Sequence, residues 1–452
     1  MQTFDYNLFM VYVCNNCGQT SPKKMGKCFI CEKWDTFVLK SDNSDNKKAK
    51  TSQKTSTRIS DASVNKVEEF STNIAEMDRV LGNGMVAGST ILIGGEPGIG
   101  KSTLSLQIAG NFKNERVLYV AGEESPSQIK ARAQRIQALD NDLYLYDDND
   151  VSLIENQINE IKPKLVIIDS IHTIESSYSD SSPGSVSQLK NCSIILSELA
   201  KANNFILILV AHITKDGVIA GPKTLEHLVD TVLYFEQVDR NDLRILRTTK
   251  NRFGTTNEIG IFEMTEKGLI ESLDPSRVFL SSENTINPGS AITTSFEGSR
   301  PILVEIQSLV SNPLQSFGKR YSNGIENNKC TLMVAIVEKF LTKRLSDKDV
   351  FLNISKGLRI KDASTDLAIV ASILSSISNK SLKKGCAFLG EIGLSGEVKN
   401  VGKLDKRLSE LDRLGFTLCY LPLDSKKDVS KLKFNHLKCE YLSDIRDLDR
   451  VI

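Results

Sequence analysis

A phosphate-binding pattern occupies residues 95–103, which read GEPGIGKST. The pattern G-x-x-x-x-G-K-[ST] needs a strand before it and a helix after it, and here TILIG precedes it and STLSLQIAGNF follows. Backbone N–H groups would surround a β-phosphate, Lys101 would reach the β- and γ-phosphate oxygens, and Ser102 would ligate Mg²⁺. We therefore expect ATP and Mg²⁺ to bind at Gly95, Glu96, Pro97, Gly98, Ile99, Gly100, Lys101, Ser102 and Thr103.

Two sets of carboxylates follow apolar runs in the same region. Asp169 ends LVIID and would be the second Mg²⁺ ligand beside the phosphate loop, although such an Asp could also cap a helix. Glu123 and Glu124 follow VLYVAG, and either could activate the attacking water. Taken alone they could be surface acids, but the carboxyl end of a strand is where α/β sheets bind ligands.

Histidine is rare in the chain, and one residue is well placed. His212 ends FILILVAH, where it could sense a γ-phosphate. A lone His is more often structural, so both interpretations stay open. His172, His227 and His436 receive no role.

Four cysteines near the start form a candidate metal site. Cys14-x2-Cys17 and Cys28-x2-Cys31 can bring two thiolate pairs onto one tetrahedral Zn²⁺. So short a segment buries little core, so the metal would supply folding free energy. Reduced cysteines without a metal, or a redox pair, are the alternatives that two CxxC units disfavour.

Composition limits the class of protein. At roughly 150 residues per domain, 452 residues indicate about three domains, and 40% hydrophobic with 25% charged residues exclude a disordered or fibrous chain. The 57 basic and 56 acidic residues leave a formal charge of +1, so any nucleic-acid surface must be a local patch. Trp34 and Phe37 beside the cysteines could stack on a base, but packing of the ribbon is the preferred interpretation.

The sequence predicts a soluble, cytoplasmic protein without a membrane partner. It has no run of about 18 apolar residues, and its start lacks a basic segment followed by a signal-type cleavage site. Nine cysteines, with four in CxxC pairs, suit metal thiolates in a reducing compartment, so structural disulfides are not expected.

Composition also divides the chain. We expect a zinc-binding domain at 1–40, a flexible linker at 41–65, an α/β domain at 66–272, a second linker at 273–289 and a C-terminal α/β domain at 290–452. The first linker is almost entirely Ser, Thr, Asn, Asp and Lys, and the second is rich in turn formers without periodicity.

The α/β domain alternates apolar runs with helical patterns, which predicts a sheet that is parallel in its first half. The runs are TILIG, VLYVAGEES, KLVIIDS, FILILVAH, TVLYFE, LRILRTTKN and EIGIFEM. Because only short gaps separate the last three, we expect an antiparallel edge. Beyond the second linker, PILVEIQSLV, CTLMVAIVEKFL and DLAIVASILSSIS resume strand and helix patterns.

The order of cysteine knuckles, linker, phosphate loop and acidic pair resembles that of the RadA (Sms) family of bacterial DNA-repair ATPases, along the whole chain. The most specific element is Lys250-Asn-Arg252-Phe-Gly254, since KNRFG is a signature of that family. The resemblance implies a RecA-type ATPase fold, with Glu123 as the water-activating carboxylate and His212 at the γ-phosphate sensor position. It also implies homo-hexameric rings that act with the RecA recombinase on single-stranded and branched DNA.

Lys250 and Arg252 admit three interpretations. KNRFG is similar to the KNRNG-like tract of hexameric replicative helicases, whose Lys and Arg reach the γ-phosphate on the neighbouring subunit. That similarity implies a finger acting in trans, with DNA contact as the second choice. From the residues alone, Arg244 and Arg247 lie nearby, which also fits a solvated basic hairpin.

The C-terminal domain resembles the Lon protease domain through the segment GEIGLSGEV at 390–398. Lon proteases need a Ser nucleophile activated by Lys. Here Ser364 stands at the Ser position and Arg407 at the Lys position, and a guanidinium cannot act as a base at neutral pH. Lys406, one residue away, would point about 100° away on a helix. We therefore expect an inactive protease domain that serves as an assembly and DNA scaffold.

The resemblance to the RadA family implies a DNA-dependent ATPase that translocates on single-stranded DNA and promotes branch migration and strand-exchange extension with RecA. The alternative is a KaiC-like, nucleotide-switched hexameric assembly module without DNA motor activity, since paired Glu residues serve the same chemistry there.

Overall fold

The computed structural model forms two compact units, residues 1–65 and 66–452. It describes residues 12–14, 20–21, 25–28, 30–31, 33–39, 68–139, 142–176, 182, 184–212, 221–238, 242–272, 274, 276, 278–280, 287–313 and 318–452. The predicted linker at 41–65 and the predicted metal ligand Cys17 lie outside the described residues.

The N-terminal unit contains a small antiparallel sheet of order β2-β1-β3. Its strands are β1 (Tyr12–Cys14), β2 (Thr20–Ser21) and β3 (Phe37–Leu39).

Among the described residues of this unit, few side chains are buried. Phe37 is 2% exposed and packs against Cys14 and Cys28, as predicted. Trp34 is 71% exposed, so the prediction that it packs the ribbon is wrong. Its ring lies beside Gly26, which has no side chain to cover it.

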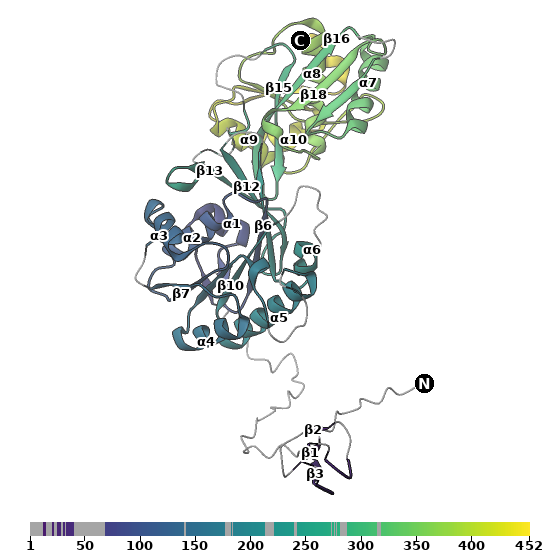
Figure 1. Ribbon diagram of the computed structural model, residues 1–452. Helices are drawn as coiled ribbons and strands as arrows, with labels where there is room; N and C mark the ends of the chain where they lie inside the picture. The colour runs from purple at the N-terminus through teal and green to yellow at the C-terminus, as the bar shows by residue number, and fades with distance from the viewer. Residues whose placement is uncertain are drawn as a thin grey trace, which may run out of the picture. The chain divides into compact units, whose positions relative to one another are not determined.

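A nine-stranded sheet of order β14-β13-β12-β11-β6-β10-β9-β7-β8 organises the central domain in the described residues (Figure 1). Its strands are β6 (Thr90–Gly95), β7 (Val117–Ala121), β8 (Leu143–Tyr146), β9 (Leu165–Asp169), β10 (Ile206–His212), β11 (Thr231–Gln237), β12 (Leu243–Asn251), β13 (Ile259–Thr265) and β14 (Gly268–Glu271). A separate ribbon pairs β4 (Glu69–Phe70) with β5 (Met85–Val86).

The seven apolar runs predicted as strands are all strands of this sheet. Strands β6 to β11 pair in parallel, and β12 to β14 pair antiparallel. The predicted antiparallel edge is confirmed, because β11 pairs antiparallel with β12 and β12 with β13. On its other side β11 runs parallel to β6, so it joins this edge to the parallel part of the sheet. Strands β8 and β14, one at each edge of the sheet, escaped prediction because both are short and only partly buried.

Helices cover both faces of the sheet, which buries the apolar strands between them (Figure 1). One face packs against α1 (Ala75–Leu81), α2 (Lys101–Asn111) and α3 (Pro126–Arg135). The other packs against α4 (Val151–Ile161), the 3-10 turn η2 (Ile171–Thr173), α5 (Val186–Asn203) and α6 (Gly221–Glu226). Among the described helices, none is both long and apolar enough to cross a membrane.

The C-terminal domain combines two main sheets. A four-stranded sheet contains β15 (Ser290–Glu297), β16 (Arg300–Ser311), β18 (Asp349–Ile354) and β17 (Arg320–Asn323), with α7 (Asn327–Leu341) and α8 (Asp366–Ser378) packed nearby. A parallel sheet contains β19 (Cys386–Phe388), β22 (Leu418–Pro422) and β23 (Lys438–Leu442). The domain also contains further short elements: the hairpin β20 (Glu391–Ile392) and β21 (Val398–Lys399), α9 (Leu404–Arg413), α10 (Lys426–Val429) and the 3-10 turns η3 (Ser355–Gly357), η4 (Ala363–Thr365), η5 (Leu423–Ser425) and η6 (Ile445–Arg450).

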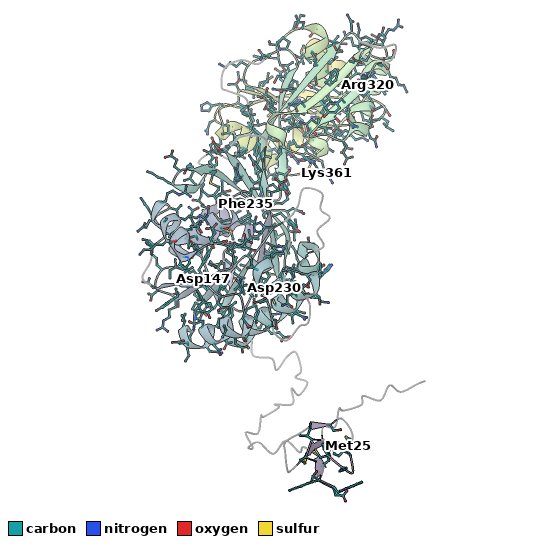
Figure 2. All side chains as sticks on the ribbon, in the orientation of Figure 1. Met25, Asp147, Asp230, Phe235, Arg320 and Lys361 are labelled. Atoms are coloured by element: carbon teal, nitrogen blue, oxygen red, sulfur yellow. The ribbon has the colours of Figure 1, made fainter. Side chains whose placement is uncertain are left out.

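The central and C-terminal domains share a hydrophobic core, to which β12, β13, β15 and β16 contribute (Figure 1). Polar contacts reinforce it, since Arg300 donates to both carboxylate oxygens of Glu76 at 2.8 and 2.9 Å. Lys361, labelled in Figure 2, lines the cleft that remains between the two domains.

Candidate functional site

The phosphate loop joins β6 to α2, and backbone geometry requires its glycines. Gly98 and Gly100 have φ values of 77° and 117°, in the left-handed region that favours glycine. Gly95 lies against β11, where a Cβ atom would come within 2.8 Å of the Phe235 carbonyl oxygen. The tight turn into α2 and the close approach of β11 therefore account for the spacing of these glycines.

Lys101, the first residue of α2, is 3% exposed. Its Nζ donates to two carbonyl oxygens of the loop, both at 2.9 Å, and lies 3.2 Å from Nδ1 of His212. Burial lowers the pKa of Lys101 to about 8, although Asp169 and Glu123 oppose the shift. The amine is thus held between the loop carbonyls and His212, at the start of the helix whose N–H groups would receive a phosphate.

Asp169 ends β9 between β7 and β10. Tyr119 Oη donates to its Oδ2 at 2.5 Å, and the Ser102 hydroxyl also bonds to this carboxylate. Burial raises the pKa of Asp169, and these two hydrogen bonds oppose the shift. Ser102 and Asp169 thus offer adjacent oxygen ligands, the type that Mg²⁺ prefers. Sequence patterns did not single out Tyr119, because it is one buried residue of a β-strand.

Glu123 lies in a chain of hydrogen bonds that reaches Lys101. Ser170 Oγ donates to Glu123 Oε1 at 2.5 Å, and His212 Nε2 lies 3.2 Å from the same oxygen. Because Lys101 donates to Nδ1 of His212, a neutral His212 ring carries its hydrogen on Nε2 and donates it to Glu123. The Glu123 side chain is 44% exposed, so water can reach it.

Glu124 has a different environment. Its Oε1 accepts from Nη2 of Arg132 at 2.7 Å, and its Oε2 is buried and, in the part of the chain that the structure describes, has no hydrogen-bond partner. The ion pair with Arg132 thus occupies Oε1, and the other oxygen is shielded from water. Of the two candidates left open by the sequence, only Glu123 contacts His212.

Lys250 lies at the end of the sheet opposite to the phosphate loop of its own chain. It pairs with Val232 of β11, which pairs with Leu92 of β6, three residues before Gly95. At about 3.3 Å per residue, this register separates the backbone of Lys250 from the start of the loop by about 10 Å along the strand direction.

The side chains of Lys250 and Arg252 are engaged at that end. Lys250 Nζ donates to the carbonyl oxygens of Glu226 and Val229, each at 2.7 Å. Arg252 Nη1 lies 3.0 Å from Asp230 Oδ1 and its side chain is still 54% exposed. In this geometry neither cation contacts the phosphate loop of the same chain.

Two further arginines of β12 do not belong to a solvated basic hairpin, so that interpretation is wrong for them. Arg244 is 8% exposed, and its Nε donates to the Ile99 carbonyl oxygen of the phosphate loop at 3.1 Å. Arg247 bonds to Glu297 at 2.6 Å across the domain joint. Sequence proximity to Lys250 was misleading because the strand spans the sheet from one end to the other.

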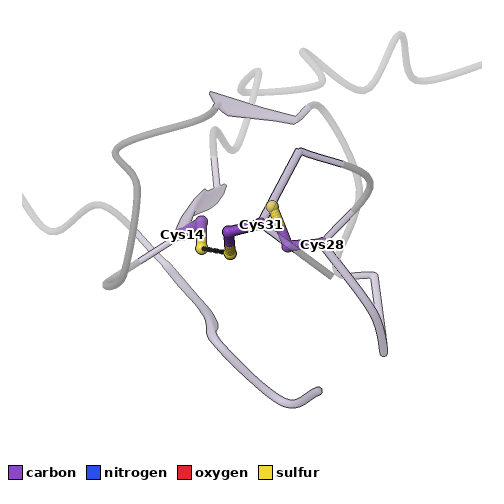
Figure 3. A group of neighbouring side chains, drawn as sticks. All are labelled: Cys14, Cys28 and Cys31. Atoms are coloured by element: carbon purple, nitrogen blue, oxygen red, sulfur yellow. Dashed lines mark hydrogen bonds between the residues drawn. The ribbon is translucent and has the colours of Figure 1, made fainter. Parts of the chain in front are cut away.

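Three of the predicted metal ligands, Cys14, Cys28 and Cys31, lie together in the N-terminal unit (Figure 3). Their sulfurs are within 4.8 Å of one another, and Cys14 Sγ is 3.7 Å from Cys31 Sγ. Neighbouring sulfurs on a tetrahedral Zn²⁺ with bonds of about 2.3 Å lie about 3.8 Å apart. These thiolates therefore fit a zinc ion, and Cys17, outside the described residues, is the expected fourth ligand.

Ser364 of the C-terminal domain is 1% exposed and bonds to Arg407. Its Oγ accepts from Arg407 Nη1 at 2.9 Å and donates to the Thr294 carbonyl oxygen at 3.0 Å. Arg407 Nη2 also binds Asp362 Oδ2 at 2.7 Å. The neighbouring Lys406 is exposed.

Comparisons with known proteins agree with this architecture. Three family models match: an AAA domain at 53–218, a rubredoxin metal binding domain at 12–38, and a Lon protease (S16) C-terminal proteolytic domain at 329–452. The DNA repair protein RadA of Streptococcus pyogenes serotype M6 is 43% identical over 92% of this chain and 93% of its own length. The chain belongs to the RadA family of DNA repair proteins. RadA of Bacillus subtilis is 43% identical, over 91% of this chain and 92% of its own, and RadA of Listeria monocytogenes is 42% identical, over 92% of each.

RadA membership confirms the family resemblance and the predicted fold class. The AAA match includes the phosphate loop, Glu123, Asp169 and His212, so this set lies in an ATPase domain. The metal-binding match includes all four predicted cysteine ligands. The chain is therefore a DNA-repair ATPase of the RadA family with a metal-binding N-terminal unit.

Proposed function

We propose that the chain is a cytoplasmic, DNA-dependent ATP hydrolase that acts in homologous recombination. It would translocate on single-stranded DNA and promote branch migration and strand-exchange extension with RecA. The observation that carries the enzymatic part is the continuous contact from Lys101 through His212 to Glu123 at the phosphate loop. Family membership supports the role in DNA repair.

The roles at the nucleotide site follow from these contacts. Lys101 would bind the β- and γ-phosphate oxygens, replacing its bonds to the loop carbonyls. Ser102 and Asp169 would hold Mg²⁺, which supplies charge neutralisation between the phosphates. Glu123 would accept a proton from the attacking water, and His212 would register the γ-phosphate because it bridges Lys101 and Glu123.

Lys250 and Arg252 would complete the site of a neighbouring subunit in a homo-hexamer. Their distance from the phosphate loop of their own chain supports action in trans. The exposed guanidinium of Arg252 is available to a partner. Such a finger neutralises charge in the transition state, so hydrolysis would require the assembled ring.

The C-terminal domain would be a scaffold without protease activity. Arg407 occupies the place of the activating Lys beside Ser364, and a guanidinium does not accept a proton near pH 7. Ser364 is also inaccessible to a peptide. Exposed Arg359, Lys361 and Lys403 line the cleft beside the central domain and would contact a DNA backbone. Two of the carboxylates that also line the cleft, Glu297 and Asp362, are paired with arginines.

The test is the rate of ATP hydrolysis of the intact protein with and without single-stranded DNA. We expect DNA to raise the rate, and Lys101→Ala to reduce both rates to background. Equal rates with and without DNA would favour a KaiC-like, nucleotide-switched assembly module instead. Hydrolysis that survives Lys101→Ala would refute the assignment of the phosphate loop.

A further inference from the structure

Strand β10 extends beyond its neighbour β9 at the nucleotide site. The last residue of β9, Asp169, pairs with Val210, whereas β10 continues to His212. On its other side His212 still pairs with Gly95 of β6. The backbone N–H of His212 therefore lies past the last residue of β9, so no carbonyl oxygen of that strand can accept a hydrogen bond from it.

A side chain supplies the missing acceptor. The His212 N–H donates to Nε2 of His172 at 3.0 Å. His172 belongs to the turn η2 just after β9, between the fully buried Ile171 and Thr173, whose hydroxyl donates to the Ser170 carbonyl oxygen at 2.8 Å. The ring is thus attached to a short, anchored turn.

This bond defines the state of the His172 ring. Nε2 accepts a hydrogen bond, so it carries a lone pair and the hydrogen of the neutral ring is on Nδ1. Burial lowers the pKa of His172, which agrees with a neutral ring. His212 has the opposite arrangement, with its hydrogen on Nε2 and its Nδ1 facing Lys101.

We propose that His172 is a positioning residue for His212. Its ring replaces a ladder carbonyl beyond the end of β9 and holds the last residue of β10 where the His212 ring contacts both Lys101 and Glu123. Removing the acceptor leaves a peptide N–H without a partner, and rotation of that peptide would move the His212 side chain away from the two groups. The inference rests on the proposed hydrolysis of ATP, because its kinetic consequence is a loss of turnover.

The kinetic test compares His172→Leu, which removes the acceptor, with His172→Gln, whose Oε1 can accept the same bond. We expect His172→Leu to lower kcat about 10- to 100-fold, as for other small displacements of a catalytic group, with little change in KM for ATP. His172→Gln should retain most of kcat. The matched control is His436→Leu, a substitution of an exposed histidine in the C-terminal domain, and its kcat and KM should equal those of the wild type.

A double-mutant comparison separates positioning from packing. In a His212→Ala background, His172→Leu should cause no further loss, because its effect passes through His212. Three outcomes would each overturn the proposal. They are an equal loss of kcat in both backgrounds, a wild-type kcat for His172→Leu, and a kcat for His172→Gln as low as that of His172→Leu. If His172→Leu does not fold, His172→Asn replaces it, since the shorter amide cannot reach the His212 N–H.

A second measurement does not depend on hydrolysis. In protein labelled with ¹⁵N at its four histidines, the ring nitrogen shifts should show His172 with hydrogen on Nδ1 and His212 with hydrogen on Nε2. Hydrogen on Nε2 of His172 would contradict the proposal even in an active enzyme. If these tautomers are found but the wild type does not hydrolyse ATP, the proposed function fails and the geometric inference stands.

Discussion

Replacing Arg407 with Ala tests whether this residue stabilises the C-terminal domain in place of a catalytic Lys. Arg407 is 4% exposed. It donates to the carbonyl oxygens of Thr294 and Gly402 at 2.7 and 3.0 Å, in addition to its bonds with Ser364 and Asp362. The substitution would leave a mostly buried carboxylate without its cation.

Breaking a buried ion pair from one side costs about 3–5 kcal/mol. Asp362 would keep two backbone donors, the N–H groups of Ser364 and Phe296 at 3.0 and 3.1 Å. We therefore expect the lower end of that range, about 3 kcal/mol of unfolding free energy. Because residues 66–452 form one unit with a shared core, the entropy of unfolding is that of the whole unit, and this loss corresponds to a decrease of about 4 °C in Tm.

Circular dichroism and hydrogen exchange in β15 and α9 would measure this loss. Fluorescence is unsuitable because the single Trp of the chain is Trp34, in the separate N-terminal unit. Lys406→Ala, an exposed neighbour on the same helix, is the control and should change stability by less than about 0.5 kcal/mol. If Arg407→Ala is as stable as Lys406→Ala, or if it abolishes a peptidase activity, the interpretation is wrong.

The same ion pair predicts a dependence on pH. Burial alone would raise the pKa of Asp362, but the Arg407 guanidinium and the backbone donors outweigh it, and the net shift is downward from 3.8. A lowered pKa in the folded state stabilises the protein above pH 3.8, and the contribution is lost as the pH falls through the folded value. The stability difference between wild type and Asp362→Asn should thus be largest at neutral pH and shrink below pH 3.8.

Three other predictions concern the nucleotide and metal sites. Glu123→Gln should lower kcat for ATP hydrolysis at least about 100-fold, and Glu124→Gln should lower it far less, because only Glu123 contacts His212. Similar losses of kcat in the two variants would refute our choice of Glu123 as the residue that activates water. Cys28→Ser should release about one zinc per chain in metal analysis. The unfolding temperature of residues 66–452 should stay unchanged, since they form a compact unit of their own. Iron in the purified protein, or no metal, would contradict the zinc assignment. Mixing inactive Lys101→Ala subunits with inactive Arg252→Ala subunits should restore some ATP hydrolysis, because an intact Arg252 can meet an intact Lys101 at a mixed interface. If mixed rings co-purify but do not hydrolyse ATP, DNA contact remains as the role of Arg252.

Local patterns were sufficient for much of the fold and the nucleotide site. The phosphate loop has a fixed spacing because its backbone conformation requires glycine at set positions. Burial on both faces makes strands such as β9 apolar up to the residue at their carboxyl end. The carboxyl-end residues Asp169 and His212 followed from those strands. Strands β8 and β14 did not, since both are edge strands of only four residues that are partly exposed.

Non-local geometry explains what sequence patterns missed. Arg244 and Lys250 lie on one strand, yet the pairing of β12 with β11 places Arg244 at the phosphate loop and Lys250 at the opposite end. The choice between Glu123 and Glu124 depends on Arg132 and His212, which come from other elements. The exposure of Trp34 depends on what packs over it, and no spacing rule reports that.

The most direct test of the proposed motor activity is the extension of joint DNA molecules formed by RecA. Wild-type protein with ATP should lengthen the heteroduplex, and Lys101→Ala, which keeps the C-terminal domain intact, should not. Equal extension by wild type and Lys101→Ala, or no extension by a wild type that hydrolyses ATP on single-stranded DNA, would contradict the account.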